Sequence, residues 1–68
     1  MEVKTKYNLG DPVYILDGYA IRRTNIGGIG IDIVGNSINI TYRFPAFPMR
    51  REKECFKTKE DLIKHLSK

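Results

Sequence analysis

Few residues in this chain could act as a nucleophile, an acid or a base. His65 is the only histidine and Cys55 the only cysteine. His65 is expected near the end of a helix, where it would favour the negative end of the helix dipole. Cys55 is expected to be a small buried hydrophobe, although the neighbouring Lys53 and Lys57 could instead lower the pKa of a reactive thiol. Without a paired catalytic constellation, the sequence predicts a protein that is not an enzyme.

The acidic residues and glycines do not form a metal or phosphate motif. Asp11, Asp17 and Asp32 lie in different turns or strands and lack the spacing of a calcium loop. One histidine and one cysteine cannot supply the four ligands of a structural zinc site. The Gly27–Gly30 segment lacks a following Lys-Ser/Thr pair and does not open a helix, so a bent strand explains it better than a phosphate loop. We therefore expect no cofactor and no metal.

Arginines and aromatic rings are the residues best suited to binding. A guanidinium group is a planar fork that suits phosphate, and an aromatic face beside it can stack on a base. The predicted ligand-binding residues are Arg22, Arg23, Arg43, Arg50, Arg51, Tyr14, Tyr19 and Phe47. They favour a binding module for an anionic ligand, either nucleic acid or a nucleotide. The alternative is that the arginines only solubilise the strands while the aromatic rings fill the core.

An apolar, proline-stiffened stretch at 44–49 supports a second hypothesis, a protein partner. If Phe44-Pro45-Ala46-Phe47-Pro48-Met49 is exposed, it forms a patch suited to protein contact. Tyr14, Tyr19, Phe47 and Met49 would then make the interface. If the stretch is buried, it is a corner that closes one end of the fold. The sequence leaves both alternatives open.

Alternating apolar residues and turn signals predict five strands. Pro12 suits the start of a strand, Asp17-Gly18 and Gly35-Asn36-Ser37 suit turns, and the paired Gly27-Gly28 suits a bend. Isoleucines at every second position in 29–34, and Ile38, Ile40, Tyr42 and Phe44 in 38–44, indicate two strands of one hairpin. The expected strands are 13–16, 19–26, 29–34, 38–44 and a short, charged one within 49–54.

A helix is expected at about 58–67. Thr58 can cap it, and Glu60 and Asp61 suit the positive end of the helix dipole. The strands, at about 7–54, should form a small barrel with this helix across one open end. The predicted core consists of Val13, Ile15, Ile29, Ile31, Ile33, Ile38, Ile40, Tyr42, Leu62, Ile63 and Leu66.

The opening and closing segments resemble known small barrels. Tyr7-Asn8-Leu9 followed by Gly10-Asp11-Pro12-Val13 resembles the start of SH3-like barrels, including the KOW and Tudor relatives. Residues 7–66 are also similar to short bacterial and bacteriophage proteins that end like Phe56-Lys57-Thr58-Lys59-Glu60-Asp61-Leu62. The prolines at 45–48 depart from that pattern. The resemblance implies a mainly β fold, a five-stranded SH3-like barrel with a short C-terminal α-helix, and it allows a phage-encoded antagonist of a host bacterial factor.

Composition sets the remaining expectations. The 68 residues carry a net charge of +4, which is compatible with anionic partners, and they suit one domain spanning 1–68. No apolar run approaches membrane-spanning length, so we expect a cytoplasmic protein, bacterial or in the host of a phage, with no membrane partner. A short chain has a thin core, and its open strand edges favour a homodimer through the strand from Tyr19 to Ile26.

Overall fold

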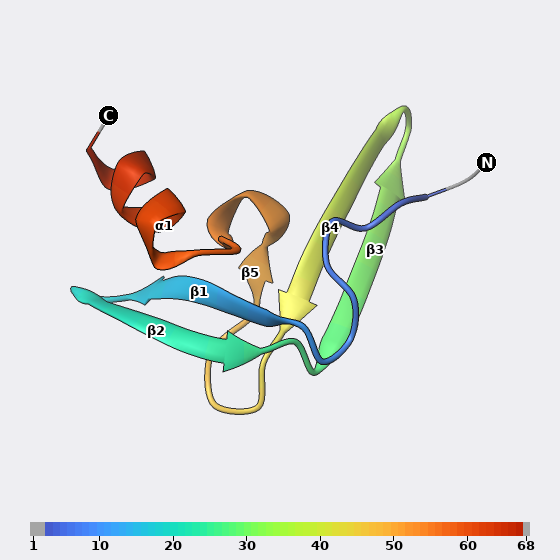
Figure 1. Cartoon of the computed structure of the whole chain (residues 1–68). Helices are drawn as coiled ribbons and strands as arrows, with labels where there is room; N and C mark the ends of the chain where they lie inside the picture. Colours follow the sequence, from blue (N-terminus) through green and yellow to red (C-terminus); the bar gives the residue numbers. More distant parts are fainter. Residues whose placement is uncertain (1–2, 68) are drawn as a thin grey trace.

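Two antiparallel hairpins provide most of the β structure in the computed structural model, which describes residues 3–67 (Figure 1). β1 (Pro12–Asp17) pairs with β2 (Ala20–Asn25), and β3 (Gly28–Val34) pairs with β4 (Ser37–Arg43). Gly18 and Gly35 adopt φ angles of 62° and 60° in the two turns, a conformation that glycine reaches at little cost. The predicted turns, and the predicted hairpin of the isoleucine strands, are therefore confirmed.

The last strand is very short. β5 (Arg50–Arg51) pairs with β4 over two residues, and the chain then forms a 3-10 turn, η1 (Glu52–Glu54). Beyond this turn, Phe56 meets β1 in a single bridge, in which the backbone N–H groups of Tyr14 and Phe56 each donate to the other's carbonyl at 2.7 and 3.0 Å.

The fold is therefore mainly β, with the predicted five strands and one C-terminal helix. Residues 3–67 form two separate sheets, β1-β2 and β3-β4-β5, and no closed barrel. A two-residue β5 and a single bridge leave the ladder too short to close.

The core lies where the two hairpins meet. Val13, Ile15 and Tyr42 are completely buried there, as predicted. The cluster also includes Tyr7, Ile26, Phe44 and Cys55, and Ile29, Ile40 and Phe47 pack against it. The burial of Ile26 removes one of the residues expected to make an exposed dimer surface on the second strand.

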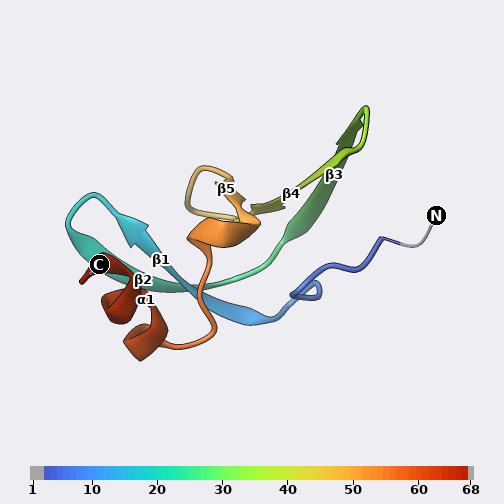
Figure 2. The ribbon, with the colours of Figure 1, turned by 90° about the horizontal axis from the view of Figure 1, so that it is seen from above.

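Three isoleucines predicted for the core lie in solvent instead. Ile31, Ile33 and Ile38 are 49%, 48% and 42% exposed. Register pairs Ile31 with Ile40 and Ile33 with Ile38, so these side chains do share one face of the hairpin. The β3–β4 hairpin extends beyond the core, however, and none of the described elements packs over its far end (Figures 1 and 2). The alternation predicted the common face correctly, but the prediction of burial was wrong.

The helix α1 (Lys59–Leu66) is present, with Thr58 as its N-cap; the Thr58 hydroxyl accepts the N–H of Asp61 at 3.1 Å. α1 lies against β1 rather than across a barrel end (Figure 1). Only Leu62 is buried; Ile63 and Leu66 are 46% and 51% exposed, contrary to prediction. Ile63 lies about 100° around the helix from Leu62, so one contact line cannot bury both. No helix in the described part of the chain is long and apolar enough to cross a membrane.

Candidate functional site

The predicted binding arginines are distributed over several surfaces. Arg22 and Arg23 are successive residues of β2 and therefore point to opposite faces. Arg22 lies opposite Ile15, and Arg23 lies opposite Tyr14. Of the predicted site residues, Tyr14 and Arg23 are thus brought together as cross-strand neighbours on one face.

Arg50 is held by the backbone. Its guanidinium donates to the carbonyl oxygens of Pro48 at 2.9 Å, Met49 at 3.3 Å and Leu16 at 3.4 Å. These bonds tie the loop before β5 to the end of β1. The arrangement gives Arg50 a structural task and leaves fewer of its donors for a ligand.

The Arg43 side chain lies close over Gly28 of the neighbouring strand. A Cβ atom on Gly28 would come within 2.7 Å of the Arg43 Nε and 3.2 Å of its Nη2. Gly28 therefore leaves the space in which the guanidinium crosses β3. Gly30 does the same for Thr41, whose Oγ1 would lie 2.7 Å from a Cβ. Gly28 and Gly30 therefore allow close packing between β3 and β4.

The predicted aromatic residues differ widely in exposure. Tyr19 is fully exposed at the tip of the β1–β2 hairpin, while Tyr14 is half-buried. Within the proline-rich stretch, Phe44 is buried and Phe47 packs against the core, whereas Met49 is 58% exposed. The stretch therefore has the inward-facing rings expected of a corner, while Pro45, Ala46, Pro48 and Met49 remain exposed.

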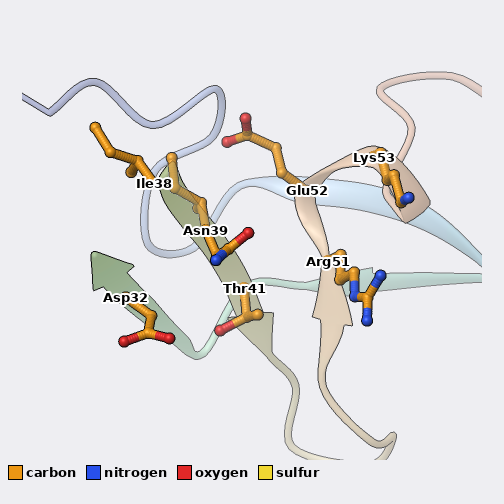
Figure 3. Close-up of a pocket in the computed structure, with 8 residues that line it drawn as sticks. Asp32, Ile38, Asn39, Thr41, Arg51, Glu52 and Lys53 are labelled. Atoms are coloured by element: carbon orange, nitrogen blue, oxygen red, sulfur yellow. The ribbon is translucent and has the colours of Figure 1, made fainter. Parts of the chain in front are cut away.

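One hollow lies beside the edge of β4, with a volume of about 590 Å³ (Figure 3). It is lined by Asp32, Ile38, Asn39, Ile40, Thr41, Arg51, Glu52 and Lys53. Two carboxylates oppose two basic groups there, so the hollow has no excess charge. In addition, Glu52 Oε2 already accepts the Tyr42 hydroxyl at 2.6 Å and the Lys6 N–H at 3.0 Å. This hollow gives an anion no electrostatic advantage.

A second hollow, of about 330 Å³, is strongly basic; we call it the lysine hollow. It is lined by Lys6, Tyr7, Phe56, Lys57, Asp61, Lys64 and His65. Its lining includes three lysines and one aspartate, which together leave an excess of two positive charges. Lys6, Lys57 and Lys64 are all exposed. Three separate segments therefore converge on one cationic, solvent-open site.

The N-terminal wall of the lysine hollow is fixed by hydrogen bonds. The Lys6 N–H donates to Glu52, and the Tyr7 N–H donates to the Tyr42 hydroxyl at 3.2 Å. The Tyr7 hydroxyl in turn donates to the Cys55 carbonyl at 3.2 Å. Lys6 Nζ lies 5.7 Å above the Tyr7 ring, a cation–π distance. These bonds hold Lys6 beside the segment that carries Lys57.

The opposite wall is built by α1 and the Phe56 bridge. The rings of Phe56 and His65 are 5.2 Å apart and tilted by 43°. Because Phe56 is paired with Tyr14, this contact fixes the helix relative to β1. Cross-strand pairs share a face, so Arg23, Tyr14 and Phe56 form one row across the sheet that leads into the lysine hollow.

The sequence analysis missed the lysines of this site. Lys6 is separated from Lys57 and Lys64 by most of the chain, and only the tertiary fold brings them together. Lys57 lies just before the helix, and Lys64 lies next to His65 near its end. The position of these two lysines at the helix ends is the only sign of the site in the sequence.

The Cys55 thiol has none of the features of a nucleophile. It is 2% exposed, and burial, followed by the charge of Glu54, raises its pKa to about 11. The thiol is therefore protonated at neutral pH. Within residues 3–67, no group of three or more His, Cys, Asp or Glu side chains is placed to hold a metal ion.

The geometry is thus that of a small two-sheet protein with a basic hollow at the junction of its N-terminal segment and its helix. No family model, curated protein or solved structure matches this chain.

Proposed function

We propose that this protein is a non-enzymatic binding module for a phosphate-bearing ligand, held at the lysine hollow. The main support for this proposal is that Lys6, Lys57 and Lys64 line one hollow that contains a single carboxylate. Ammonium groups act as point charges for phosphate and donate short, charge-assisted hydrogen bonds to its oxygens. The flexible stems of exposed lysines allow the three groups to adjust to one anion.

The row of Arg23, Tyr14 and Phe56 supports a ligand longer than one phosphate. Neighbouring strands lie about 4.8 Å apart, so the row extends the basic and aromatic surface by about 10 Å from the hollow. Phosphate contacts combined with aromatic faces are the usual means of binding single-stranded nucleic acid. The ligand we favour is therefore a nucleic-acid strand, with a free nucleotide as the smaller carrier of the same chemistry.

We also infer that the fold is an open relative of the SH3-like barrels. The inference is supported by the order of pairings: β1 with β2, β3 with β4, β4 with β5, then a 3-10 turn and a bridge from Phe56 back to β1. Small barrels of this kind carry many functions. The fold is therefore consistent with a binding module, and the positive charge of the lysine hollow is the reason for proposing an anionic ligand.

Binding of a labelled single-stranded oligonucleotide tests the proposal. The variant Lys57→Glu with Lys64→Glu should weaken binding at least tenfold. For wild-type protein, affinity should fall steeply with salt, because phosphate contacts release counterions. The matched control is Arg51→Glu with Lys53→Glu, which makes the same charge change at the balanced hollow beside β4 and should weaken binding much less.

Two results would overturn this proposal. One is the absence of oligonucleotide binding by the wild-type chain at low salt, and the other is an equal loss in both double variants, which would indicate general charge attraction. A parallel titration with ATP distinguishes a nucleic-acid strand from a free nucleotide as the ligand. If ATP binds as tightly as the oligonucleotide, a nucleic-acid strand is contradicted as the favoured ligand, and the phosphate site is retained.

A further inference from the structure

β3 forms an open edge of the three-stranded sheet. The strand order is β3-β4-β5, so β3 has a strand partner on one side only among residues 3–67. All seven of its residues, Gly28 to Val34, take part in pairing with β4, which leaves the alternate backbone groups directed at the other side. Asp32 is the one charged residue of this strand. A long edge with so little charge is a template for pairing with another strand.

The same strand carries an apolar face that the protein itself does not cover. Ile31 and Ile33 are about half exposed, and the neighbouring β4 adds Ile38. These side chains share one face because register pairs Ile33 with Ile38 and Ile31 with Ile40. An added strand would place its own side chains about 4.5–5.5 Å from them and remove part of this surface from water.

We infer that the partner of this edge is a second copy of the chain, paired antiparallel through β3 about a two-fold axis at Ile31. This register places Ile31 opposite the partner's Ile31 and Ile29 opposite the partner's Ile33. It continues to Gly28 opposite the partner's Val34, so all seven residues of β3 find partners. Isoleucines thus meet isoleucines on one face, as a two-fold contact requires of a self-complementary surface.

Charge on the other face fits the same register. Gly30 lies opposite the partner's Asp32, and Gly28 is its diagonal neighbour, a separation of about 7–8 Å that long side chains can span. The Arg43 guanidinium lies over Gly28, as the 2.7 Å approach of Nε to a Cβ position shows. Arg43 of each copy is therefore within reach of the partner's Asp32, and the two-fold axis makes this pair twice. A register centred on Asp32 would instead place two carboxylates opposite each other.

Sedimentation velocity from low micromolar to millimolar concentration tests the dimer. A single edge contact lies at the small end of interface sizes, so we expect a reversible, concentration-dependent dimer. Asp32→Arg and Arg43→Asp should each weaken it at least tenfold, because each places like charges together. An equal mixture of the two variants should recover the dimer, since both cross-copy pairs then become opposite in sign.

Matched controls separate this contact from a general effect. Arg51→Asp makes the same charge change on β5, the opposite edge of the sheet, and should leave the dimer intact. Ile31→Lys should abolish it, whereas Ile63→Lys, at a similar exposure on α1, should not. A monomer mass for wild-type protein throughout, or a mixture of Asp32→Arg and Arg43→Asp that stays monomeric while both remain folded by circular dichroism, would overturn the inference.

Discussion

Replacing Tyr42 with phenylalanine should strongly destabilise this protein. The Tyr42 side chain is completely buried, and its hydroxyl donates to Glu52 at 2.6 Å while accepting the Tyr7 N–H at 3.2 Å. A hydrogen bond to a charged group contributes about 1.5–3 kcal/mol, and its loss also leaves the Tyr7 N–H buried without a partner. We expect a loss of about 2–4 kcal/mol, a large part of the roughly 3–10 kcal/mol typical of a chain of this size.

The same hydroxyl should make stability depend on alkaline pH. Burial, followed by the hydrogen bond to Glu52, raises the pKa of Tyr42 from 10.0 to about 12. Because the pKa is higher in the folded state, the contribution is complete below about pH 10 and is lost as pH rises from 10 to 12. A shift of this size corresponds to roughly 3 kcal/mol. Phenylalanine has no proton to lose, so the variant should lack this component.

Urea unfolding followed by circular dichroism measures both effects. At pH 7 the unfolding midpoint of Tyr42→Phe should lie well below that of wild-type protein, and the gap should narrow as pH rises from 10 to 12. Tyr19→Phe is the control, because Tyr19 is fully exposed and should change stability by less than about 0.5 kcal/mol. A Tyr42→Phe loss below about 1 kcal/mol, or a gap that stays constant with pH, would refute this account of the hydroxyl.

Three further changes probe other contacts. The Cys55 thiol, buried and with a pKa raised to about 11, should resist alkylation at pH 8 until urea unfolds the chain; rapid labelling of folded protein would contradict its burial. Gly30→Ala should destabilise by about 1 kcal/mol or more, because the added methyl would meet Oγ1 of Thr41, a short β-branched side chain, at 2.7 Å; unchanged stability in urea would show that Thr41 rotates away freely. Thr58→Ala removes the cap on the Asp61 N–H and should cost about 1 kcal/mol, seen as lower helical ellipticity and an earlier urea midpoint; Thr58→Ser should retain most of both.

The sequence was sufficient to predict the local elements. Alternating residues defined the β3 and β4 strands, Gly18 and Gly35 marked the turns, and Thr58 marked the helix start. Each of these signals depends on residues within a few positions of one another. The common face of Ile31 and Ile38 followed from the same alternation.

The burial of individual isoleucines and the location of the lysine hollow could not be predicted from such local patterns. Ile31 and Ile15 are both isoleucines within predicted strands, yet one is half exposed and the other completely buried. Their difference depends on how far each hairpin extends past the other, which is a property of the whole fold. The lysine hollow has the same origin, since Lys6 is held beside Lys57 by the bonds of Lys6 and Tyr7 to Glu52, Tyr42 and Cys55.

The bridge between Tyr14 and Phe56 also bears on the order in which parts of the chain fold. Both hairpins join residues close in sequence, so they can form early, whereas this bridge and the bond from Tyr7 to the Cys55 carbonyl close loops that span most of the chain. Non-local contacts of this kind form late because loop closure costs entropy before any contact is gained. During folding, Val13 and Ile15 should therefore stay in contact with water, between two marginally stable hairpins, until Phe56 pairs with Tyr14.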